Sequence, residues 1–392
     1  MTISYAGKMT QMILQNLKSI NSWIKFLSFN KSHWLVSGLM WLLIIFPAQA
    51  VEIKVAIKKE VPRLKIGSST SAIIKDGAGK QLGKLTPMSS LAAKLERNNI
   101  TIANRVQARE LTIEPEDDGY VWIGDRWYRG TTRLIRQDNG ITAINHVDLE
   151  QYLYSVVGAE AVSSWPIEAL KAQAVAARSY ALYKRDRESN GIYDVDTTIG
   201  TQVYQGLATE YTTTHEAVNS TLGQIMTYNN EVILAAFHSS SGGHTENVED
   251  VWTSPLPYLR AVVDYDHQSP VFEWQQVIPV SKIKSLVAGI GNIRGLQPDQ
   301  MTPRGRVITM KVTGDRGSTT VSGKELRKAL ALRSTLFRVS TDGNNLHIKG
   351  RGFGHGLGLS QWGAYYLAQK GVNYHQILAH YYQSADLTKL EP

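Results

Sequence analysis

The distribution of hydrophobic and polar positions divides the chain into regions of different periodicity. From Val51 to Ile144, short stretches alternate apolar and polar residues and are separated by glycine-rich turns. This alternation is typical of strands that bury one face. It predicts a small antiparallel β domain without obvious chemistry, for which we expect a scaffold or docking role. The predicted strands include Glu52–Ile57, Ala72–Ile74, Val121–Ile123 and Thr142–Ile144.

The period changes to that of a helix after residue 147. The apolar residues of Asp148–Val157 recur at i, i+3, i+4, i+7 and i+8, which predicts an amphipathic helix. Asp148 and Gln151 resemble a capping box at its start, and Gly158 is expected to end it. A second, alanine-rich helix is predicted over Ile167–Lys184, and its small side chains would let another backbone pack closely.

Mixed β/α sequence follows between residues 271 and 345. Val307–Val312 and Thr319–Val321 are predicted strands, and a helix is expected over Gly323–Leu332. We expect this segment to form an inserted lobe that walls one side of a groove.

A run of alternating glycines precedes the last part of the chain. Glycine occupies every second position from Gly350 to Gly358, which in an extended strand would leave one face without side chains. Such a bare face allows close approach of a backbone or a sugar ring. After it, Ser360 is expected to cap a helix over Gln361–Gln369, which Gly371 would close.

Together these patterns predict an α+β fold, in which a small N-terminal β domain precedes a helix-containing core with an inserted lobe that forms a groove. The expected divisions are a signal peptide at 1–50, a β-rich region at 51–144, a core at 145–270 and 346–392, and the lobe at 271–345.

The composition is that of a folded protein and excludes several functional classes. Hydrophobic residues make up 43% and charged residues 19% of the 392 residues, which excludes a disordered chain. The net charge is +8, of which four lysines in residues 1–50 supply +4, so the remaining body carries only 8 − 4 = +4. Because that surplus is small and unclustered, no nucleic-acid partner is expected. Cysteine is absent, which excludes disulfides, a cysteine nucleophile and thiolate metal ligands.

The N-terminal segment predicts export across the cytoplasmic membrane. Trp34–Phe46 is an uncharged apolar run preceded by lysines, and Ala48 and Ala50 form a small-residue cleavage site after it. These features indicate a secretory signal peptide, with an uncleaved membrane anchor as the alternative. In either case the body is expected in the periplasm or cell wall, and the membrane is contacted only if the leader is retained. Export argues against ATP and NAD as cofactors.

Glu160 is the first candidate for chemistry. It lies between the two predicted helices, close in sequence to Val157, Val162 and Trp165. Apolar surroundings remove hydration from a carboxyl group and raise its pKa, which is what a general acid at neutral pH requires. The alternative is a structural glutamate that caps the next helix or pairs with Arg178.

Three histidines are further candidates. His238 and His244 flank a Ser-Ser-Ser-Gly-Gly turn with acids after it, and His355 lies within the glycine run. The first two could bind zinc with a carboxylate, contact a polar substrate, or make structural hydrogen bonds. Gln361, at the start of the last predicted helix, would face the groove.

Three stretches of the chain resemble the SpoIID/LytB family, the stage II sporulation protein D type of peptidoglycan lytic transglycosylase. They occur in the family's order, and the resemblance extends over about 51–387. The matching stretches are Asn145–Leu182, Phe237–Trp252 and Gly350–Gly371.

The resemblance implies an exported enzyme that cleaves the glycan strand between N-acetylmuramic acid and N-acetylglucosamine, on peptide-stripped glycan and without a cofactor. It makes Glu160 the catalytic acid and Arg178 a residue that binds glycan or tunes that acid. His238, His244, His355 and Gln361 would line the groove. Some relatives are thought to hold zinc at the two histidines together with cysteine, which this chain lacks.

The resemblance also implies a second functional class. Some members of the family are described as modifiers of a cell-wall amidase that do not cut glycan. The partners expected for this chain are therefore peptidoglycan glycan strands and, in the alternative, an amidase. A zinc amidase or peptidase is a more distant reading of the sequence, since no ligand set can be completed from it.

Overall fold

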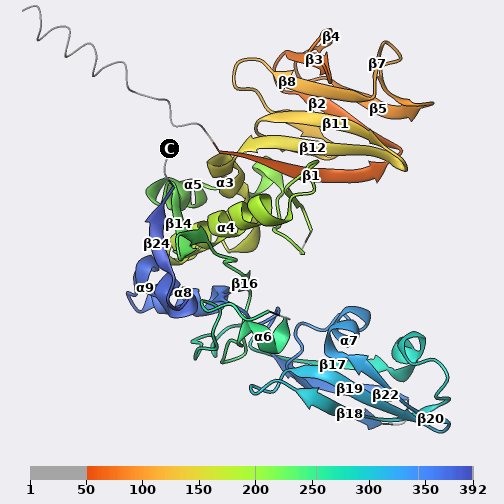
Figure 1. The fold of residues 1–392 in the computed structure, drawn as a ribbon, viewed down its shortest axis with the longest axis vertical. Helices are drawn as coiled ribbons and strands as arrows, with labels where there is room; N and C mark the ends of the chain where they lie inside the picture. Colours follow the sequence, from red (N-terminus) through yellow and green to blue (C-terminus); the bar gives the residue numbers. More distant parts are fainter. Residues whose placement is uncertain (1–50, 199, 253, 343, 391–392) are drawn as a thin grey trace, which may run out of the picture. The chain divides into compact units, whose positions relative to one another are not determined.

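The computed structural model describes residues 51–390 except Ile199, Thr253 and Gly343 (Figure 1). The predicted signal peptide lies outside these residues. Strands form several separate sheets and helices gather between them in the chain, which confirms the α+β class. Over the described part of the chain, no helix has the length and apolar character needed to cross a membrane.

Two sheets dominate the first third of the chain. Their strand orders are β13-β1-β12-β11-β8-β3-β4 and β10-β9-β2-β5-β6-β7, and all neighbours pair antiparallel except β1 and β13. The strands are β1 (Glu52–Val61), β2 (Arg63–Ser68), β3 (Ala72–Asp76), β4 (Gln81–Leu85), β5 (Ser90–Glu96), β6 (Asn99–Ile102), β7 (Val106–Ala108), β8 (Glu110–Pro115), β9 (Val121–Ile123), β10 (Arg126–Tyr128), β11 (Thr131–Gln137), β12 (Gly140–Asp148) and β13 (Val195–Asp196).

The predicted alternation is visible in the burial of these strands. In β1, Ile53 and Val55 are fully buried while Lys54 between them is not. Because side chains of a strand point alternately to its two faces, the apolar set faces a shared core between the sheets. In the pairing of β1 with β12, Ile53 lies opposite Val147. Val147 immediately precedes Asp148, the N-cap residue of the first helix.

Two helices follow, α3 (Leu149–Glu160) and α4 (Ile167–Glu188). The Asp148 carboxylate accepts a hydrogen bond from the Gln151 backbone amide at 3.0 Å. Of the predicted capping box, the bond from the backbone to the N-cap side chain is therefore confirmed. The expected end at Gly158 is wrong, since α3 continues to residue 160. A Cβ at position 158 would lie 2.1 Å from the Thr209 carbonyl oxygen, so glycine is needed there for close packing rather than for termination.

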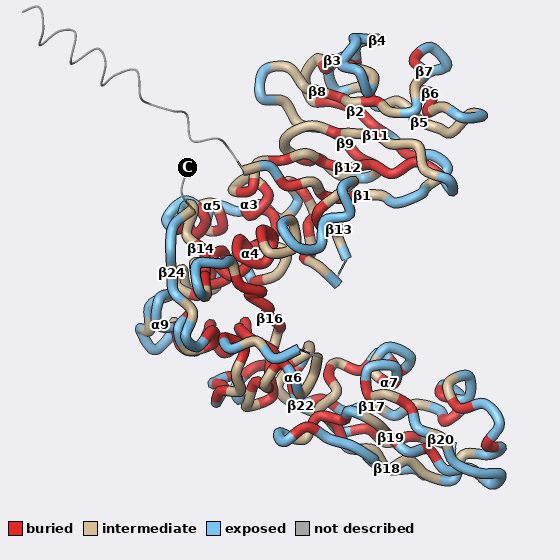
Figure 2. The backbone as a smooth tube through the Cα atoms, viewed as in Figure 1, coloured by how far each residue is buried: buried red, intermediate tan, exposed pale blue. Residues whose placement is uncertain are grey.

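The middle of α4 is buried along most of its length (Figure 2). Its alanines let α5, β14, α8 and α9 pack closely against it, as the small side chains predict. The elements of this part are η1 (Gly206–Thr209), α5 (Thr212–Ser220), β14 (Gln224–Tyr228), β15 (Glu231–Val232), β16 (Phe237–His238), α6 (Val248–Val251), β23 (Leu359–Ser360), α8 (Gln361–Gln369), α9 (Tyr374–Tyr381) and β24 (Asp386–Lys389).

The lobe consists of two three-stranded sheets, β17-β22-β21 and β18-β19-β20, around a core of its own. Its elements are β17 (Glu273–Pro279), η2 (Val280–Leu286), β18 (Ile293–Met301), β19 (Val307–Gly314), β20 (Gly317–Ser322), α7 (Gly323–Ala329), β21 (Phe337–Asp342) and β22 (Asn345–Arg351). The first residue of β17, Glu273, pairs directly with Arg351 at the end of β22. The helix α7 ends three residues before the expected Leu332, because Ala331 adopts a left-handed backbone.

The glycine run after β22 does not form the extended strand that its alternation predicted. Four of its glycines have left-handed backbones, with φ of 72° at Gly352, 121° at Gly354, 83° at Gly356 and 65° at Gly358. Residues with side chains rarely adopt these values, which explains the glycine at each turn. The segment packs against β16 and its flanks, where a Cβ at position 354 would lie 2.6 Å from the His238 Cβ.

Candidate active site

Glu160 ends helix α3 with its carboxyl group partly withdrawn from solvent. The Val203 amide donates a hydrogen bond to Oε1 at 2.7 Å. Burial raises the pKa of the Glu160 carboxyl above its usual range, and the Val203 amide and the Gln361 side chain offset part of that rise. The group therefore holds its proton to higher pH than an exposed glutamate does.

The Val203 amide is positioned by anchors on either side of it. The Tyr152 hydroxyl of α3 donates to the Gln202 side chain at 3.0 Å, and the Tyr204 hydroxyl donates to Asn145 at 2.8 Å. Gln202 and Tyr204 are both buried. Because the two flanking side chains are fixed in the core, the backbone between them presents its N–H to Glu160 in one orientation.

Gln361 reaches the same carboxyl from the C-terminal part of the chain. It is the first residue of α8, whose N-cap Ser360 accepts a hydrogen bond from the Gly363 amide at 3.2 Å, as the sequence predicted. Its amide also donates to the Gln173 side chain of α4 at 3.3 Å. The Gln173 nitrogen is buried and has no hydrogen-bond partner among the described residues, which leaves a donor near the Gln361 amide.

An aromatic cluster lies beside these polar groups. The Trp165 ring, in the α3–α4 loop, is 4.9 Å from the Trp362 ring and 5.2 Å from the Tyr365 ring, measured between centroids. Tyr366 stacks 6.0 Å from Trp362. All four rings are half-buried, so each keeps an exposed part. Of these rings the sequence analysis considered only Trp165, although the i, i+3, i+4 spacing of Trp362, Tyr365 and Tyr366 on α8 was a signal for the other three.

His238 and His355 form a second polar group close to β23, the short strand that precedes α8. Their ring centroids are 5.2 Å apart, and β16 pairs with β23 so that His238 lies opposite Ser360. His355 Nε2 is 2.9 Å from the Phe237 carbonyl oxygen, while its Nδ1 accepts from the Leu357 amide at 3.0 Å. Burial lowers the pKa of His355 to about 4 and that of His238 well below its usual value. Both rings are therefore neutral at pH 7.

The turn that follows His238 is held by internal hydrogen bonds. The Ser240 and Ser241 hydroxyls donate to Asp266 and Asp264, each at 2.5 Å. The Asp266 carboxylate also accepts from the Gly242 amide at 2.8 Å. These contacts favour the structural role that the sequence left open for this turn.

The residues do not assemble the zinc site considered for His238 and His244. Within the described residues, no three His, Cys, Asp or Glu side chains gather closely enough to hold a metal ion. The backbone of His244 instead pairs with that of Val263, and its buried Nδ1 has no hydrogen-bond partner in the part of the chain that the structure describes. Zinc was one of three alternatives for these histidines, it stays untested, and no chemical step is assigned to it.

Arg178 does not face a substrate, contrary to the role expected for it. Its side chain has no exposed surface, and its guanidinium pairs bidentately with Glu150 at 2.8 and 2.6 Å. It also donates to the Gln224 carbonyl at 2.9 Å. Glu150 lies ten residues before Glu160 on α3, about 15 Å along the helix, so Arg178 cannot contact the acid directly. Its place is structural, where α3, α4 and β14 meet.

Comparison with known proteins relates the chain to one family. The model described as "Stage II sporulation protein" matches residues 137–228, and a domain of unknown function (DUF8618) matches residues 258–358. Stage II sporulation protein D of Bacillus subtilis (strain 168) is 35% identical over 276 residues, which cover 64% of this chain and 77% of that protein. Its counterpart in Bacillus amyloliquefaciens is 34% identical over 270 residues, 64% of this chain and 76% of that protein. An amidase enhancer of Bacillus subtilis (strain 168) is 32% identical over 291 residues, 60% of this chain and 40% of that protein.

The buried position of Arg178 yields a stability prediction. Glu150→Ala leaves the guanidinium buried without its counter-charge, and we expect the free energy of unfolding to fall by about 3 kcal/mol. The matched control is Glu188→Ala, which removes the exposed partner of Lys184 on α4. It should lower the free energy of unfolding by no more than about 0.5 kcal/mol. Urea denaturation followed by circular dichroism measures both. Equal effects of the two substitutions would contradict the structural role of Arg178.

Proposed function

This chain belongs to the stage II sporulation protein D family, and we propose that it is an exported peptidoglycan lytic transglycosylase with Glu160 as its single acid–base group. The bond cut is that between N-acetylmuramic acid and N-acetylglucosamine, on glycan from which the peptides have been removed. The observation that carries the proposal is the partly buried Glu160 carboxyl with its raised pKa, held by the Val203 amide.

One carboxyl group suffices for this reaction, whereas glycosidases that use water generally need two. In the proposed step, protonated Glu160 gives its proton to the glycosidic oxygen as the bond to the anomeric carbon breaks. The 6-hydroxyl oxygen of the same muramic acid attacks that carbon. Glu160, now a carboxylate, takes the hydroxyl proton and is restored. The product carries a 1,6-anhydro end, and no water is consumed.

The groups around Glu160 fit separate parts of this step. The Val203 amide and the Gln361 side chain donate to the carboxylate form, which limits the rise of its pKa and eases the release of the proton to the glycosidic oxygen. The rings of Trp165 and Trp362 offer apolar surface on which a sugar ring can stack. Positioning of this kind lowers the barrier because the reacting atoms are already aligned.

A second candidate function is supported by the amidase enhancer among the relatives. In that reading the chain binds the cell wall and raises the activity of a separate amidase, and Glu160 is a structural acid. The raised pKa of Glu160 fits the enzyme, because a general acid must hold its proton towards neutral pH, whereas the enhancer function assigns no task to that proton.

The first prediction concerns the products. The purified body incubated with peptide-stripped glycan should release fragments with 1,6-anhydro ends, identified by mass spectrometry. Glu160→Gln should reduce the rate by at least about 100-fold, because the amide cannot donate or accept the proton. Glu188→Gln, an exposed change on α4, is the control and should leave the rate unchanged. Reducing ends, or full activity of Glu160→Gln, would exclude the mechanism.

The second prediction concerns pH. Since the folded protein raises the pKa of Glu160, the rate should be highest at low pH and fall as pH rises through that value. The folded state also binds this proton more tightly than the unfolded chain, so stability is lost as Glu160 ionises above its unfolded pKa of roughly 4.3. Glu160→Gln removes that loss and should be at least as stable as the wild type at pH 7. A marked drop in its melting temperature at pH 7 would contradict the burial argument.

The third prediction separates the two candidate functions. If the chain is an enzyme, glycan fragments appear without any amidase present. If it is an enhancer, no fragments appear, and a purified amidase releases peptides from intact sacculi faster when the chain is added. In the second case Glu160→Gln should enhance as well as the wild type does.

A further inference from the structure

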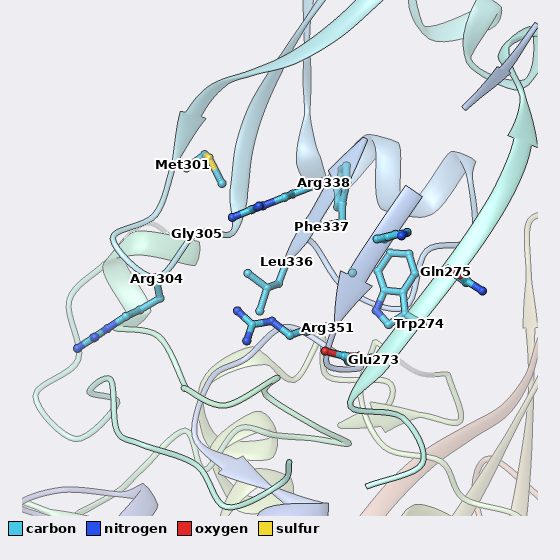
Figure 3. Close-up of a pocket in the computed structure, with 12 residues that line it drawn as sticks. Glu273, Trp274, Gln275, Met301, Arg304, Gly305, Leu336, Phe337, Arg338 and Arg351 are labelled. Carbon is cyan, nitrogen blue, oxygen red and sulfur yellow. The ribbon is translucent and has the colours of Figure 1, made fainter. Parts of the chain in front are cut away.

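A hollow of about 770 Å³ opens in the lobe, and none of the residues predicted for the site is part of its lining (Figure 3). Its size falls within the range of small-ligand sites. The lining is formed by residues of β17, β21, β22 and the turn between β18 and β19. The residues are Glu273, Trp274, Gln275, Met301, Arg304, Gly305, Leu336, Phe337, Arg338, Lys349, Gly350 and Arg351.

Two cations of this lining face each other across adjacent strands. Lys349 of β22 lies directly opposite Arg338 of β21, and on its other side opposite Gln275 of β17. Side chains of directly opposed residues lie on the same face of a sheet, and like charges in that position destabilise it. All three side chains are exposed. The sheet therefore holds two adjacent positive charges, and neither of them lies opposite an acidic residue.

Further positive charge surrounds this pair. Arg351 lies two residues after Lys349 and so on the same face of β22, and Arg304 comes from the β18–β19 turn. Glu273, opposite Arg351, is the one acid of the lining. None of the four cations takes part in an ion pair among the residues that the structure describes. An excess of cations in a concave site points to an anionic ligand.

The hollow also has apolar walls. Leu336 lies between Arg338 and Arg351 in the view of Figure 3. Trp274 and Phe337 also line the hollow, but both are buried and belong to the core of the lobe. Met301, at the rim, is 44% exposed. An anion with short aliphatic parts suits such a mixture, whereas a phosphodiester polymer would leave the apolar wall uncovered.

We propose that this hollow binds the carboxylate groups of the peptide stems of peptidoglycan. A stem carries several carboxylates beside methyl and short alkyl side chains, and arginine pairs with carboxylates in a bidentate geometry. The proposal rests on the proposed function for the choice of polymer. It separates two tasks in one chain: the lobe holds wall that still carries peptides, and Glu160 cuts glycan that has lost them.

Direct binding tests the ligand. Isothermal titration with the stem tetrapeptide L-alanyl-γ-D-glutamyl-meso-diaminopimelyl-D-alanine should show binding to the full chain that weakens as salt is added. The same peptide with its carboxylates converted to amides should not bind. Equal binding of the amidated peptide would overturn the proposal. So would binding of a glycerol-phosphate polymer with none of the tetrapeptide.

A matched pair of variants tests the site. Lys349→Gln should weaken tetrapeptide binding about tenfold, the loss expected when a charge-assisted hydrogen bond is removed. Without ligand it should raise the melting temperature, since it relieves the repulsion with Arg338. Lys311→Gln is the control: Lys311 is exposed on β19, the middle strand of the other lobe sheet, between Gln297 and Thr320. It should change neither quantity. Unchanged binding by Lys349→Gln, or equal loss in both variants, would overturn the site.

Failure of this proposal can be told apart from failure of the proposed function. Lys349→Gln should still cut peptide-stripped glycan at the wild-type rate, and Glu160→Gln should still bind the tetrapeptide. Loss of cutting in Lys349→Gln would show that the hollow belongs to the cleavage site and would overturn the separation of tasks.

Discussion

The buried guanidinium of Arg178 is the interaction on which the arrangement of the core depends. It joins α3 through Glu150 and the start of β14 through the Gln224 carbonyl, while its own helix carries α8 and α9. A buried cation opposes any displacement of its partners. Such a displacement leaves the free-energy cost of removing the cation from water unchanged, while the electrostatic attraction between the cation and its partners becomes weaker. The pair thus fixes one end of α3, and Glu160 at the other end takes its position from that anchor.

The local elements could be predicted from the sequence, because their signals lie within a few residues. The helical period and the caps at Asp148 and Ser360 gave the helices α3 and α8 with their starts. The glycine run could not be interpreted in this way, since alternating glycines fit both an extended strand and a succession of left-handed turns. Contacts with His238 and its neighbours, more than 110 residues away, decide between them. The same holds for Gly158, whose role is set by the Thr209 carbonyl.

The candidate site was predictable only in part. The apolar neighbours of Glu160 along the chain pointed to a raised pKa, and burial produces that shift. Its hydrogen-bond partners come from Val203, 43 residues later, and from Gln361 in the last helix, distances over which a single sequence shows no pairing. Arg178 illustrates the converse limit: the sequence places it on α4 but does not say which neighbour its side chain meets. Because α4 is buried on every side from Ala172 to Leu182, its sequence has no solvent-facing stripe that would indicate the direction of the Arg178 side chain.

The pairing of Glu273 with Arg351 has an evolutionary consequence. Residues directly opposed in an antiparallel pair have Cα atoms about 5 Å apart, so the chain leaves for the lobe and returns from it at nearly one point. A segment attached in this way can be lengthened, exchanged or deleted while the rest of the chain keeps its path. The helices around Glu160 can therefore carry a different appendage at this point without a change in their own packing.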